Sequence, residues 1–411
     1  MIPSIKPPFG PLRAAAAVAS FVHRVRVEDV EQAYSRAFGV PYVLLLPSCR
    51  AGICWALQAS IEKHTRVVCP VYTCMVVWEA VIRAGGKIHM VDTAEDCFLM
   101  DETALSKAQT GNYAIILCEI YGHTYDLSKI AVLASNEPVV RIVDMAMTVP
   151  TAKLFERLGT ADFAVMSFGR DKCMNAGWGG MAFTFDKALA DKVRKMRDSC
   201  LAPSNFSLLV RRSMKLIALN LSYEPMLYGF YKKRRNIRRS IRHRVLADST
   251  DSTTTLIAER LISQDWSCPA TKEWFIPTTY VERNLMLYNL RNAGRYCEQK
   301  KILAHRYHEN FEGVAGIIRP DISSDILSHY TIRVHPRLRP LLKKRLYELN
   351  IDAGTRFFFP KSFSVNDYPN ASRTASEVLN LPLDVRLTVG DVDSICRRVI
   401  LAVKHPVKAL V

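Results

Sequence analysis

The fold and chemistry of this chain are indicated most clearly by the stretch Phe163-Ala164-Val165-Met166-Ser167-Phe168-Gly169-Arg170-Asp171-Lys172. An apolar run typical of a buried strand leads into a turn that carries Lys172, and the glycine-rich segment 175–180 follows directly. A lysine on such a turn, held against a packed sheet, can lose its charge through desolvation and attack a carbonyl as a neutral amine. Lys172 is therefore the first candidate for a catalytic residue.

Short apolar runs between residues 40 and 200 alternate with amphipathic stretches. The runs predict strands at Tyr42–Leu46, Arg66–Cys69, Lys87–Val91, Tyr113–Cys118, Val139–Val143, Phe163–Phe168 and Met181–Phe185. The amphipathic stretches predict helices that include Ala51–Lys63, Met75–Ala84 and Leu127–Ala134. This alternation favours an α/β fold with a largely parallel sheet that helices cover on both faces.

The rest of the chain predicts a second, smaller unit. We expect an N-terminal segment at 1–39, a large domain at 40–200, a basic and apolar insertion at 201–270 and a C-terminal α/β domain at 271–411. The last of these shows a helical pattern from about 280 to Phe311, a strand pattern at Tyr330–Val334 and a terminal helix from Asp391 to Lys404. Asp391 is expected to cap that helix, because its carboxylate can accept from the free amides of the first turn.

The composition is that of an ordinary globular protein, with 49% hydrophobic and 23% charged residues. Eleven cysteines, an odd number without a CxxC pair, argue against a disulfide framework. Cys54, Cys69 and Cys118 lie in apolar runs, which predicts buried thiols and a cytoplasmic protein. No Cys/His spacing typical of zinc is present. The apolar patch Ala14–Val18 is too short for a signal peptide or a membrane span.

A first candidate phosphate site is Pro47-Ser48-Cys49-Arg50-Ala51-Gly52, which joins a predicted strand to a predicted helix. Free amides at a helix start, together with the hydroxyl of Ser48 and the guanidinium of Arg50, form a suitable cradle for a phosphate. The alternative is that Ser48 is simply the N-cap of the helix.

Three further strand ends carry candidate residues. Tyr72 follows the second strand and is placed to stack on a planar ring, although a tyrosine next to a proline more often serves packing. Asp144 follows the fifth strand and could keep a pyridine nitrogen protonated, although such an aspartate is more often a helix cap. Ser167 could contact a phosphate and Lys172 could bond to an aldehyde, although a lysine on a turn is usually a solvated cation.

The order of these pieces matters more than any one of them. Ligands of α/β proteins bind at the carboxyl ends of parallel strands, where all four pieces are expected. A strand-end carboxylate, a Ser/Lys turn and a Gly-Gly pair are the parts that a pyridoxal 5'-phosphate enzyme requires. The sequence therefore predicts pyridoxal phosphate as the cofactor.

These blocks make the chain resemble a divergent member of the DegT/StrS group of sugar aminotransferases, which are fold type I pyridoxal-phosphate enzymes. The central match runs from roughly Val40 to Arg197 and is carried by Asp144-Met145-Ala146, by Ser167-Phe168 with Lys172, and by Gly179-Gly180. Supporting matches lie at Tyr121-Gly122 with Asp126, at Asn350–Arg356 and at Glu377–Leu383.

The resemblance implies a large domain with a mostly parallel seven-stranded sheet and a smaller C-terminal α/β domain. It also implies that Lys172 carries the cofactor and shuttles a proton, and that Asp144 pairs with the ring nitrogen. Ser167 and the Ser48–Arg50 turn, which includes Cys49, would hold the phosphate, and Tyr72 or Cys74 would lie over the ring. Met147 stands at a further cofactor-binding position. An amino acid, L-glutamate in most of the family, would supply nitrogen to a nucleotide-linked keto sugar, as a step in surface-polysaccharide or secondary-metabolite synthesis by a homodimer.

The chain departs from the family pattern at several of these positions. Threonine-type residues usually stand at Cys49-Arg50, a larger aromatic residue at Cys74, Gln or His at Met147, and often Glu at Trp178. Thr279-Tyr280-Val281 is the nearest candidate for the family's Asn-Tyr-Arg motif. These changes leave the substrate open. They also leave open a catalytically altered or inactive member that binds a membrane or nucleic acid. Sugar dehydration is disfavoured, because dehydratases of the family have His in place of the lysine.

The net charge of +17 implies an anionic partner. The stretch from Lys232 to Arg244 holds eight Lys and Arg residues and follows a broken apolar segment. We expect an element at 206–244 that lies on an anionic inner membrane leaflet, with Phe206, Leu208, Leu209, Leu216, Ile217 and Leu219 facing lipid. The alternative is a solvated helix beside the active-site mouth. Nucleic acid is disfavoured because no aromatic residues are interleaved with the cations.

Overall fold

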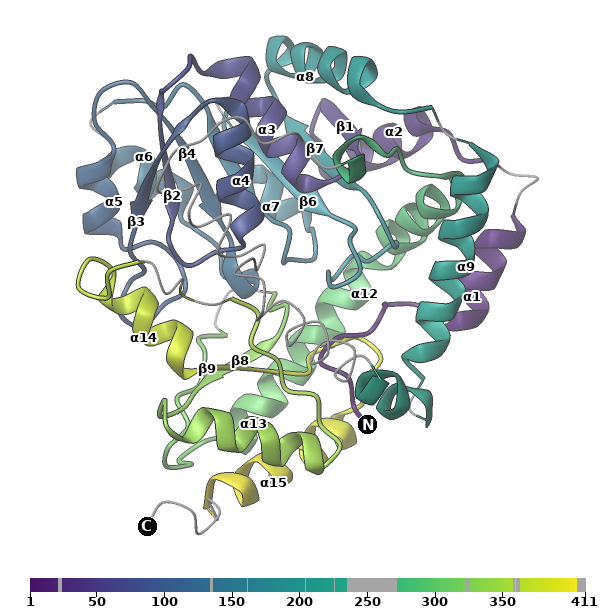
Figure 1. Ribbon diagram of the computed structural model, residues 1–411, viewed down its shortest axis with the longest axis vertical. Coiled ribbons are helices and arrows are strands. Elements are labelled where there is room, and N and C mark those ends of the chain that lie inside the picture. The colour runs from purple at the N-terminus through teal and green to yellow at the C-terminus, as the bar shows by residue number, and fades with distance from the viewer. Residues whose placement is uncertain are drawn as a thin grey trace, which may run out of the picture.

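The computed structural model shows two sheets of unequal size, and helices pack around both of them (Figure 1). It describes the chain except for residues 21–23, 134–135, 161, 204, 225, 235–271, 323–325, 358, 360–362 and 405–411. Most of the basic stretch 232–244, within the predicted insertion 201–270, therefore lies outside the described residues.

The larger sheet has seven strands in the order β1-β7-β6-β5-β4-β2-β3. They are β1 (Tyr42–Leu46), β2 (Arg66–Pro70), β3 (Lys87–Val91), β4 (Tyr113–Cys118), β5 (Arg141–Asp144), β6 (Asp162–Ser167) and β7 (Gly180–Thr184). The pairs β2·β3, β2·β4, β4·β5 and β5·β6 are parallel, and β7 is antiparallel to both of its neighbours. The predicted seven-stranded, mostly parallel α/β sheet is confirmed. The fifth strand lies slightly later than predicted and includes Asp144.

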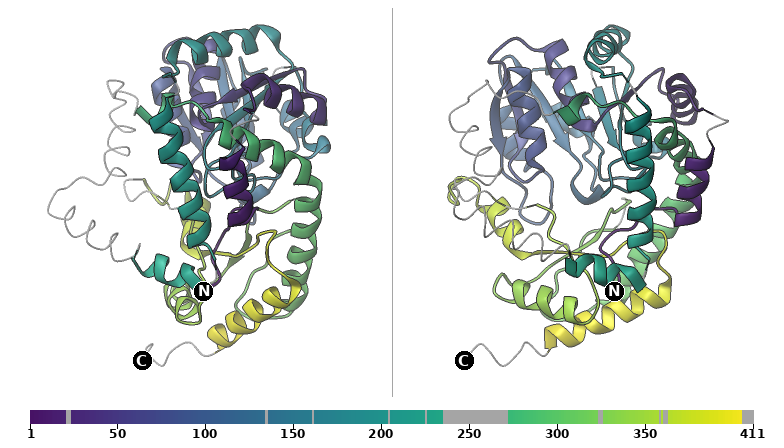
Figure 2. Two further views of the ribbon diagram at one scale, coloured as in Figure 1. Left: turned by 90° about the vertical axis from the view of Figure 1, so that its right-hand side faces the viewer. Right: turned by 45° about the vertical axis from the view of Figure 1, so that its right-hand side comes forward.

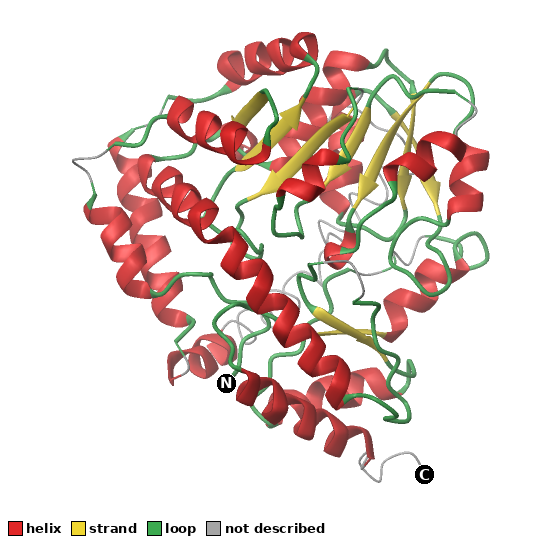
Figure 3. Ribbon diagram, turned by 180° about the vertical axis from the view of Figure 1, so that it is seen from behind, coloured by secondary structure: helices red, strands yellow, loops and turns green. Residues whose placement is uncertain are grey.

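Both faces of this sheet are covered, as Figure 3 shows from behind. One face packs against α3 (Cys49–Ser60), α4 (Met75–Ala84) and α8 (Lys187–Cys200), and buries Phe163 and Val165 of β6. The opposite face buries the alternate residues Ala164 and Met166. It packs against α2 (Val27–Phe38), α5 (Glu102–Ala108), α6 (Leu127–Leu133), α7 (Ala152–Glu156) and the first half of α12 (Tyr280–Asn310). Burial on both faces explains why the strand sequences are continuously apolar.

Side-chain caps fix where several helices begin. Ser48, Asp101, Asp186 and Asn205 each accept a hydrogen bond from a free amide in the first turn of α3, α5, α8 and α9 (Phe206–Ser222). The alternative reading of Ser48 as an N-cap is thus what the structure shows. The 31-residue helix α12 begins with a capping box between Thr279 and Glu282 and connects the two sheets.

The smaller sheet pairs β8 (Tyr330–Arg333) with β9 (Val378–Leu381) in antiparallel register. It shares a hydrophobic core with the second half of α12, with α13 (Leu338–Glu348) and with α15 (Val389–Lys404), and α14 (Pro369–Glu377) leads directly into β9. The N-terminus joins this core, because Ile2 pairs with Ile351. The domain boundaries at 39, 200 and 270 stay predictions.

The terminal helix α15 starts at Val389, two residues before the predicted cap. The amide and hydroxyl of Thr388 donate to Asp391, and the amide of Asp391 donates back to Thr388 Oγ1. Asp391 is therefore the acidic partner of a capping box whose cap is Thr388. Cys54, Cys69 and Cys118 are buried free thiols, as predicted. None of the helices in the described part of the chain has both the length and the hydropathy needed to cross a membrane.

Helix α9 (Phe206–Ser222) stands on the side of the molecule next to α1 (Pro11–Ala19), as both views in Figure 2 show. The predicted lipid-facing set is wrong for Leu208, Leu216 and Leu219, which are buried. These positions fall on the face that packs inward, because they repeat at the helical period together with buried Ser213. Phe206 of the predicted set is exposed. The other exposed large apolar residues here are Val210, Met214 and Leu221 on α9, followed by Met226, Leu227 and Phe230 on the next helix, 226–234.

Candidate active site

The carboxyl ends of four parallel strands and the start of the antiparallel β7 meet at one edge of the large sheet. Gly180, the first residue of β7, pairs with Leu46 at the end of β1 and with Ser167 at the end of β6. Asp144 ends β5 and pairs with Cys118, the last residue of β4. Because β7 runs the opposite way, the Gly-Gly segment arrives at the edge where its neighbours end. Residues 180, 167 and 144 thus lie on three adjacent strands.

A compact loop between β6 and β7 presents Lys172. The backbone amide of Lys172 donates to Gly169 O (3.2 Å), and its carbonyl accepts from Asn175 N (3.2 Å). The side chain of Asn175 donates to Arg170 O (2.6 Å) and accepts from Gly177 N (2.7 Å). Asn289 of α12 holds the loop from behind by donating to Asn175 O (2.8 Å). The loop is therefore rigid at its backbone, and Lys172 has a defined position.

These elements enclose a cavity of about 210 Å³, which we call the sheet-edge cavity. Seven of the nine predicted site residues line it: Ser48, Cys49, Arg50, Cys74, Asp144, Ser167 and Lys172. The structure thus brings these seven residues, which are far apart in the chain, to one cavity. Their individual roles toward a cofactor stay predictions.

Tyr72 and Met147 do not line this cavity. Tyr72 is fully buried, its hydroxyl lies 2.8 Å from that of Tyr121, and its ring packs edge-on against Phe357. Met147 belongs to the hydrophobic core, and its carbonyl lies 3.6 Å from the Cys173 thiol.

The half-buried carboxylate of Asp144 lines the sheet-edge cavity. Burial raises its pKa, and the Lys172 ammonium and the Ala146 amide oppose that shift in part. The Ala146 amide donates to Asp144 Oδ1 (2.9 Å), and the next helix, α7, begins only at Ala152. The alternative reading of Asp144 as a helix cap does not hold. A desolvated carboxylate that faces a cavity favours a cationic ligand group there.

The β1–α3 turn, in contrast to Asp144, offers groups that can bind an anion. The hydroxyl of Ser48 accepts from Ala51 N (3.3 Å), so the side chain serves the helix while Cys49 and Arg50 follow it along the cavity wall. Burial, and next the nearby Asp144 carboxylate, raise the pKa of the Cys49 thiol well above its ordinary value. Cys49 is therefore a neutral thiol and no nucleophile. The helix start and Arg50 favour an anion.

Two glycines allow the walls to approach each other. A Cβ on Gly180 would lie 2.4 Å from Ser48 C and 2.5 Å from Cys49 N, so only glycine permits this contact between β7 and the β1–α3 turn. Gly179 has φ +114°, and a Cβ there would also meet Met286 and Thr278. The Gly179-Gly180 pair of the sequence analysis thus shapes the cavity by backbone contact.

Two tryptophans of the cavity wall were not predicted to be site residues. Trp274 lies in a single 3₁₀ turn (Lys272–Phe275) far from the motifs, and the guanidinium of Arg50 lies 6.0 Å from its ring centroid. Trp178 was noticed in the sequence only as a departure from the family pattern. A lone Trp outside a motif carries no signal of its own in the sequence, so only the folded chain places Trp274 at the site.

A second unpredicted feature is a polar pair behind the lysine loop. Arg356 donates from Nε and Nη2 to His329 Nε2 (3.2 and 3.1 Å) and lies 3.5 Å from the Asp171 carboxylate. Burial, and next the positive charges of Arg356, Lys300 and Lys172, hold the pKa of His329 well below its ordinary value. His329 is consequently a neutral acceptor and adds no positive charge beside Lys172.

The comparisons with known proteins agree with this geometry. The sequence model of the DegT/DnrJ/EryC1/StrS aminotransferase family matches residues 12–216. The spore coat polysaccharide biosynthesis protein SpsC of Bacillus subtilis is 21% identical over 395 residues, which are 91% of this chain and 88% of that protein. The GDP-perosamine synthase of Escherichia coli O157:H7 is 25% identical over 179 residues, 43% of this chain and 49% of that protein.

Among solved structures, the putative sugar aminotransferase Spr1654 of Streptococcus pneumoniae in its PMP form has a TM-score of 0.71 at 18% sequence identity. The match covers 98% of this chain and 99% of that one. At this identity the likeness shows the fold, which is that of fold type I aminotransferases.

Proposed function

This chain belongs to the DegT/DnrJ/EryC1/StrS aminotransferase family, whose members depend on pyridoxal phosphate, and on that premise we propose its specific reaction. It transfers an amino group from an amino acid, L-glutamate, to a keto group of a nucleotide-linked sugar. The product would enter surface-polysaccharide or secondary-metabolite synthesis. The convergence of Asp144, Ser167 and Lys172 on one cavity at the sheet edge is the observation that carries this proposal.

The residues of the cavity fit the cofactor. Its cationic ring nitrogen needs a carboxylate, and Asp144 is a desolvated carboxylate whose raised pKa marks an incompletely balanced charge. Its phosphate needs donors and positive charge, which Ser48, Ser167, Arg50 and the start of α3 provide. Its aldehyde needs an amine, and Lys172 lines the same cavity. When bound, the cofactor supplies an electron sink for the bonds around the amino-acid Cα.

The chain's own residues would bind, orient and move protons. Lys172 would hold the cofactor covalently and then carry a proton at Nζ between positions of the substrate. Asp144 would keep the ring nitrogen protonated through an ion pair that burial strengthens. The loop contacts of Asn175 and Asn289 would keep Lys172 aligned, and Trp178 and Trp274 would restrict access of water.

A test of this function uses the purified full-length protein with pyridoxal phosphate. The expected result is a yellow protein that loses its colour on addition of L-glutamate and regains it with a keto sugar nucleotide. A screen of keto sugar nucleotides, with amino sugar detected by mass spectrometry, then identifies the acceptor. A protein that stays colourless with the cofactor would contradict the proposal and favour the alternative of an altered, non-catalytic member.

We propose in addition that the chain forms a homodimer, with the active site at the subunit interface, on the basis of the resemblance. Thr279-Tyr280-Val281, the nearest match to the Asn-Tyr-Arg motif that the partner subunit supplies in the family, lies at the start of α12, and Thr279 does not line the sheet-edge cavity of its own chain. Light scattering coupled to size exclusion measures the mass. A monomer that is fully active would contradict the dimer proposal.

We also propose a cytoplasmic protein that contacts an anionic membrane through α9 and helix 226–234. The support is the exposed apolar stripe Phe206, Val210 and Met214, spaced four residues apart, with exposed Phe230 on the next helix and the exposed cations Lys233 and Arg234 after it. Co-sedimentation with vesicles of phosphatidylserine and phosphatidylcholine tests this. Binding should fall in the double variant Phe206→Asp/Met214→Asp. Unchanged sedimentation, or a loss of dimer mass without loss of vesicle binding, would contradict the membrane role.

A further inference from the structure

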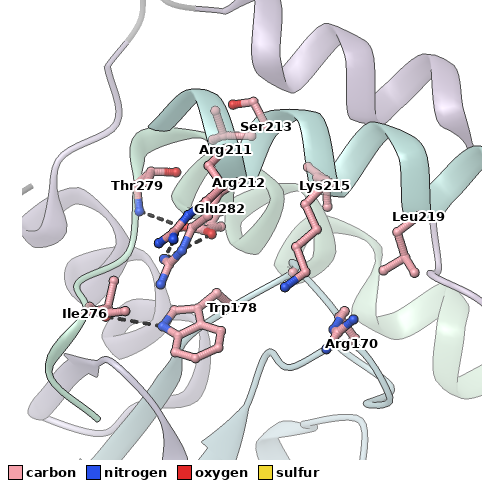
Figure 4. A pocket seen from close by; sticks show the side chains of 13 residues that line it. Arg170, Trp178, Arg211, Arg212, Ser213, Lys215, Leu219, Ile276, Thr279 and Glu282 are labelled. Atoms are coloured by element: carbon pink, nitrogen blue, oxygen red, sulfur yellow. Dashed lines mark hydrogen bonds and ion pairs between the residues drawn. The ribbon is translucent and has the colours of Figure 1, made fainter. Parts of the chain in front are cut away.

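A second cavity of about 200 Å³ lies beside the sheet-edge cavity and is formed by α9, the lysine loop and the start of α12 (Figure 4). We call it the Arg170 pocket. Arg170, Arg211, Arg212 and Lys215 contribute the positive charges of its lining. In Figure 4, the side chains of Lys215 and Arg170 approach each other from α9 and from the loop. The pocket therefore brings together cations from two segments distant in the sequence.

The charges of this pocket are unbalanced. Glu282 is the one carboxylate among its described lining residues, and it is already engaged. Arg212 Nη1 lies 3.2 Å from both of its oxygens, and the Thr279 amide donates to it (2.5 Å). Arg170, Arg211 and Lys215 form no ion pair with a described carboxylate, so three positive charges remain for a ligand.

Trp178 is the wall that the two cavities share, because it lines both. The guanidinium of Arg212 lies 4.6 Å from the centroid of its ring, and Trp178 Nε1 donates to Ile276 O (3.2 Å). The ring is thus fixed on two sides. Arg170 stands two residues before Lys172 on the same rigid loop. A ligand bound in the Arg170 pocket would consequently sit next to whatever reacts at Lys172.

We propose that the Arg170 pocket binds the diphosphate of the sugar nucleotide, which would extend from there past Trp178 into the sheet-edge cavity. This inference rests on the proposed function, and it names the residues that would hold the diphosphate of the acceptor. Two linked phosphates need several cations within a small volume, and Arg and Lys provide charge-assisted hydrogen bonds to phosphate oxygens. A single carboxylate of an amino-acid donor would leave most of this charge unbalanced.

The experiment is a calorimetric titration of the full-length, cofactor-loaded protein with UDP as the probe. Lys215→Glu and Arg211→Glu are compared with wild type, and Lys344→Glu, an exposed cation on α13, is the matched control for net charge. We expect the first two variants to bind UDP at least about tenfold more weakly, because each loses a charge-assisted contact and gains a repulsive charge. The control should bind like wild type. Far-ultraviolet circular dichroism and cofactor content verify folding.

Two further ligands show whether the phosphates or the nucleoside of UDP account for its binding. Inorganic pyrophosphate should compete with UDP, and uridine without phosphate should bind much more weakly. Equal affinity of uridine and UDP, no binding of UDP to wild type, or unchanged affinity in both α9 variants would each overturn the assignment.

The proposed function is read separately, from the colour change of wild-type protein with L-glutamate, which involves no nucleotide. If that change occurs while the UDP titration fails, the pocket assignment falls and the aminotransferase proposal stands. If UDP binds as expected while glutamate leaves the colour unchanged, the diphosphate site stands and the aminotransferase proposal falls.

Discussion

The two cavities on either side of Trp178 are built in different ways. The sheet-edge cavity is lined by residues at the ends of consecutive strands, and its charges, Asp144 and Lys172, influence each other. The Arg170 pocket is lined by α9 and by the first turn of α12, and its cations outnumber its carboxylate. The comparison shows that strand order alone can place the residues of the sheet-edge cavity, whereas the lining of the Arg170 pocket depends on how α9 packs.

The largest effect is expected when the amine of Lys172 is removed. Lys172→Ala should abolish the yellow colour and reduce transamination by at least about 10³-fold, since general acid–base catalysis alone contributes 10²–10⁴-fold and covalent attachment is lost as well. Turnover is measured as the amino sugar formed with L-glutamate, and Lys344→Ala is the control. Activity within tenfold of wild type would show that an amine other than that of Lys172 binds the cofactor and transfers the proton.

The next largest effect is expected when the carboxylate of Asp144 is replaced by a neutral amide. Asp144→Asn should weaken cofactor binding and lower activity by about 10²-fold, in keeping with loss of one buried charge-assisted contact. It should also raise the melting temperature of the cofactor-free protein at neutral pH. Because the pKa of Asp144 is raised on folding, this group contributes less stability as the pH rises above 3.8 toward that folded pKa, and asparagine avoids the cost. A lower melting temperature of the apo variant would contradict the assignment of Asp144 as an unbalanced charge.

A third prediction tests the close contact between β7 and the β1–α3 turn in the wall of the sheet-edge cavity. Gly180→Ala should reduce the free energy of unfolding by about 1–3 kcal/mol, because its Cβ would overlap the backbone of Ser48 and Cys49. Gly294→Ala is the matched control. It lies within α12 with no atom within 4 Å of the added Cβ, so it should stabilise the protein by about 0.5–1 kcal/mol. Urea denaturation measures both. Equal effects of the two substitutions would show that the close approach at Gly180 is unimportant.

The smallest expected effect concerns the polar pair behind the loop. The pKa of His329 is held well below 6.5, so the unfolded chain binds a proton that the folded chain does not as the pH falls through 6.5. Wild type should therefore lose up to about 1.4 kcal/mol of stability per pH unit below that value from this group. His329→Asn should show a shallower decline between pH 7.5 and 5.5 in denaturant titrations. An identical decline in both proteins would rule out the neutral, buried state of His329.

The sequence could predict the features that leave a local pattern of residues in the chain. The strand positions, the sheet and the meeting of seven of the nine candidate residues at one cavity were predictable, because apolar runs end where strands stop, and parallel strands stop at one edge. Tyr72 stands at such an end as well, yet its side chain turns into the core toward Tyr121. A strand end gives the position of a residue but leaves the direction of its side chain open.

The remaining features depend on contacts between distant segments. Trp274 and His329 reach the site through the packing of elements more than a hundred residues from Lys172, for which one sequence carries no local sign. The inward face of α9 was wrongly assigned, since both faces of that helix carry apolar residues and only the packing decides that Leu216 is buried and Met214 exposed. The family resemblance could indicate the cofactor chemistry and could not indicate the Arg170 pocket.

The measurement that tests the central claim most directly is the attachment point of the cofactor. Full-length protein loaded with pyridoxal phosphate is reduced with borohydride and digested, and its peptides are mapped by mass spectrometry. We expect the phosphopyridoxyl mass on the peptide that contains Lys172, and on that lysine when the peptide is fragmented. Stoichiometric modification of a different lysine, or of none, would contradict the claim that the sheet-edge cavity is the active site.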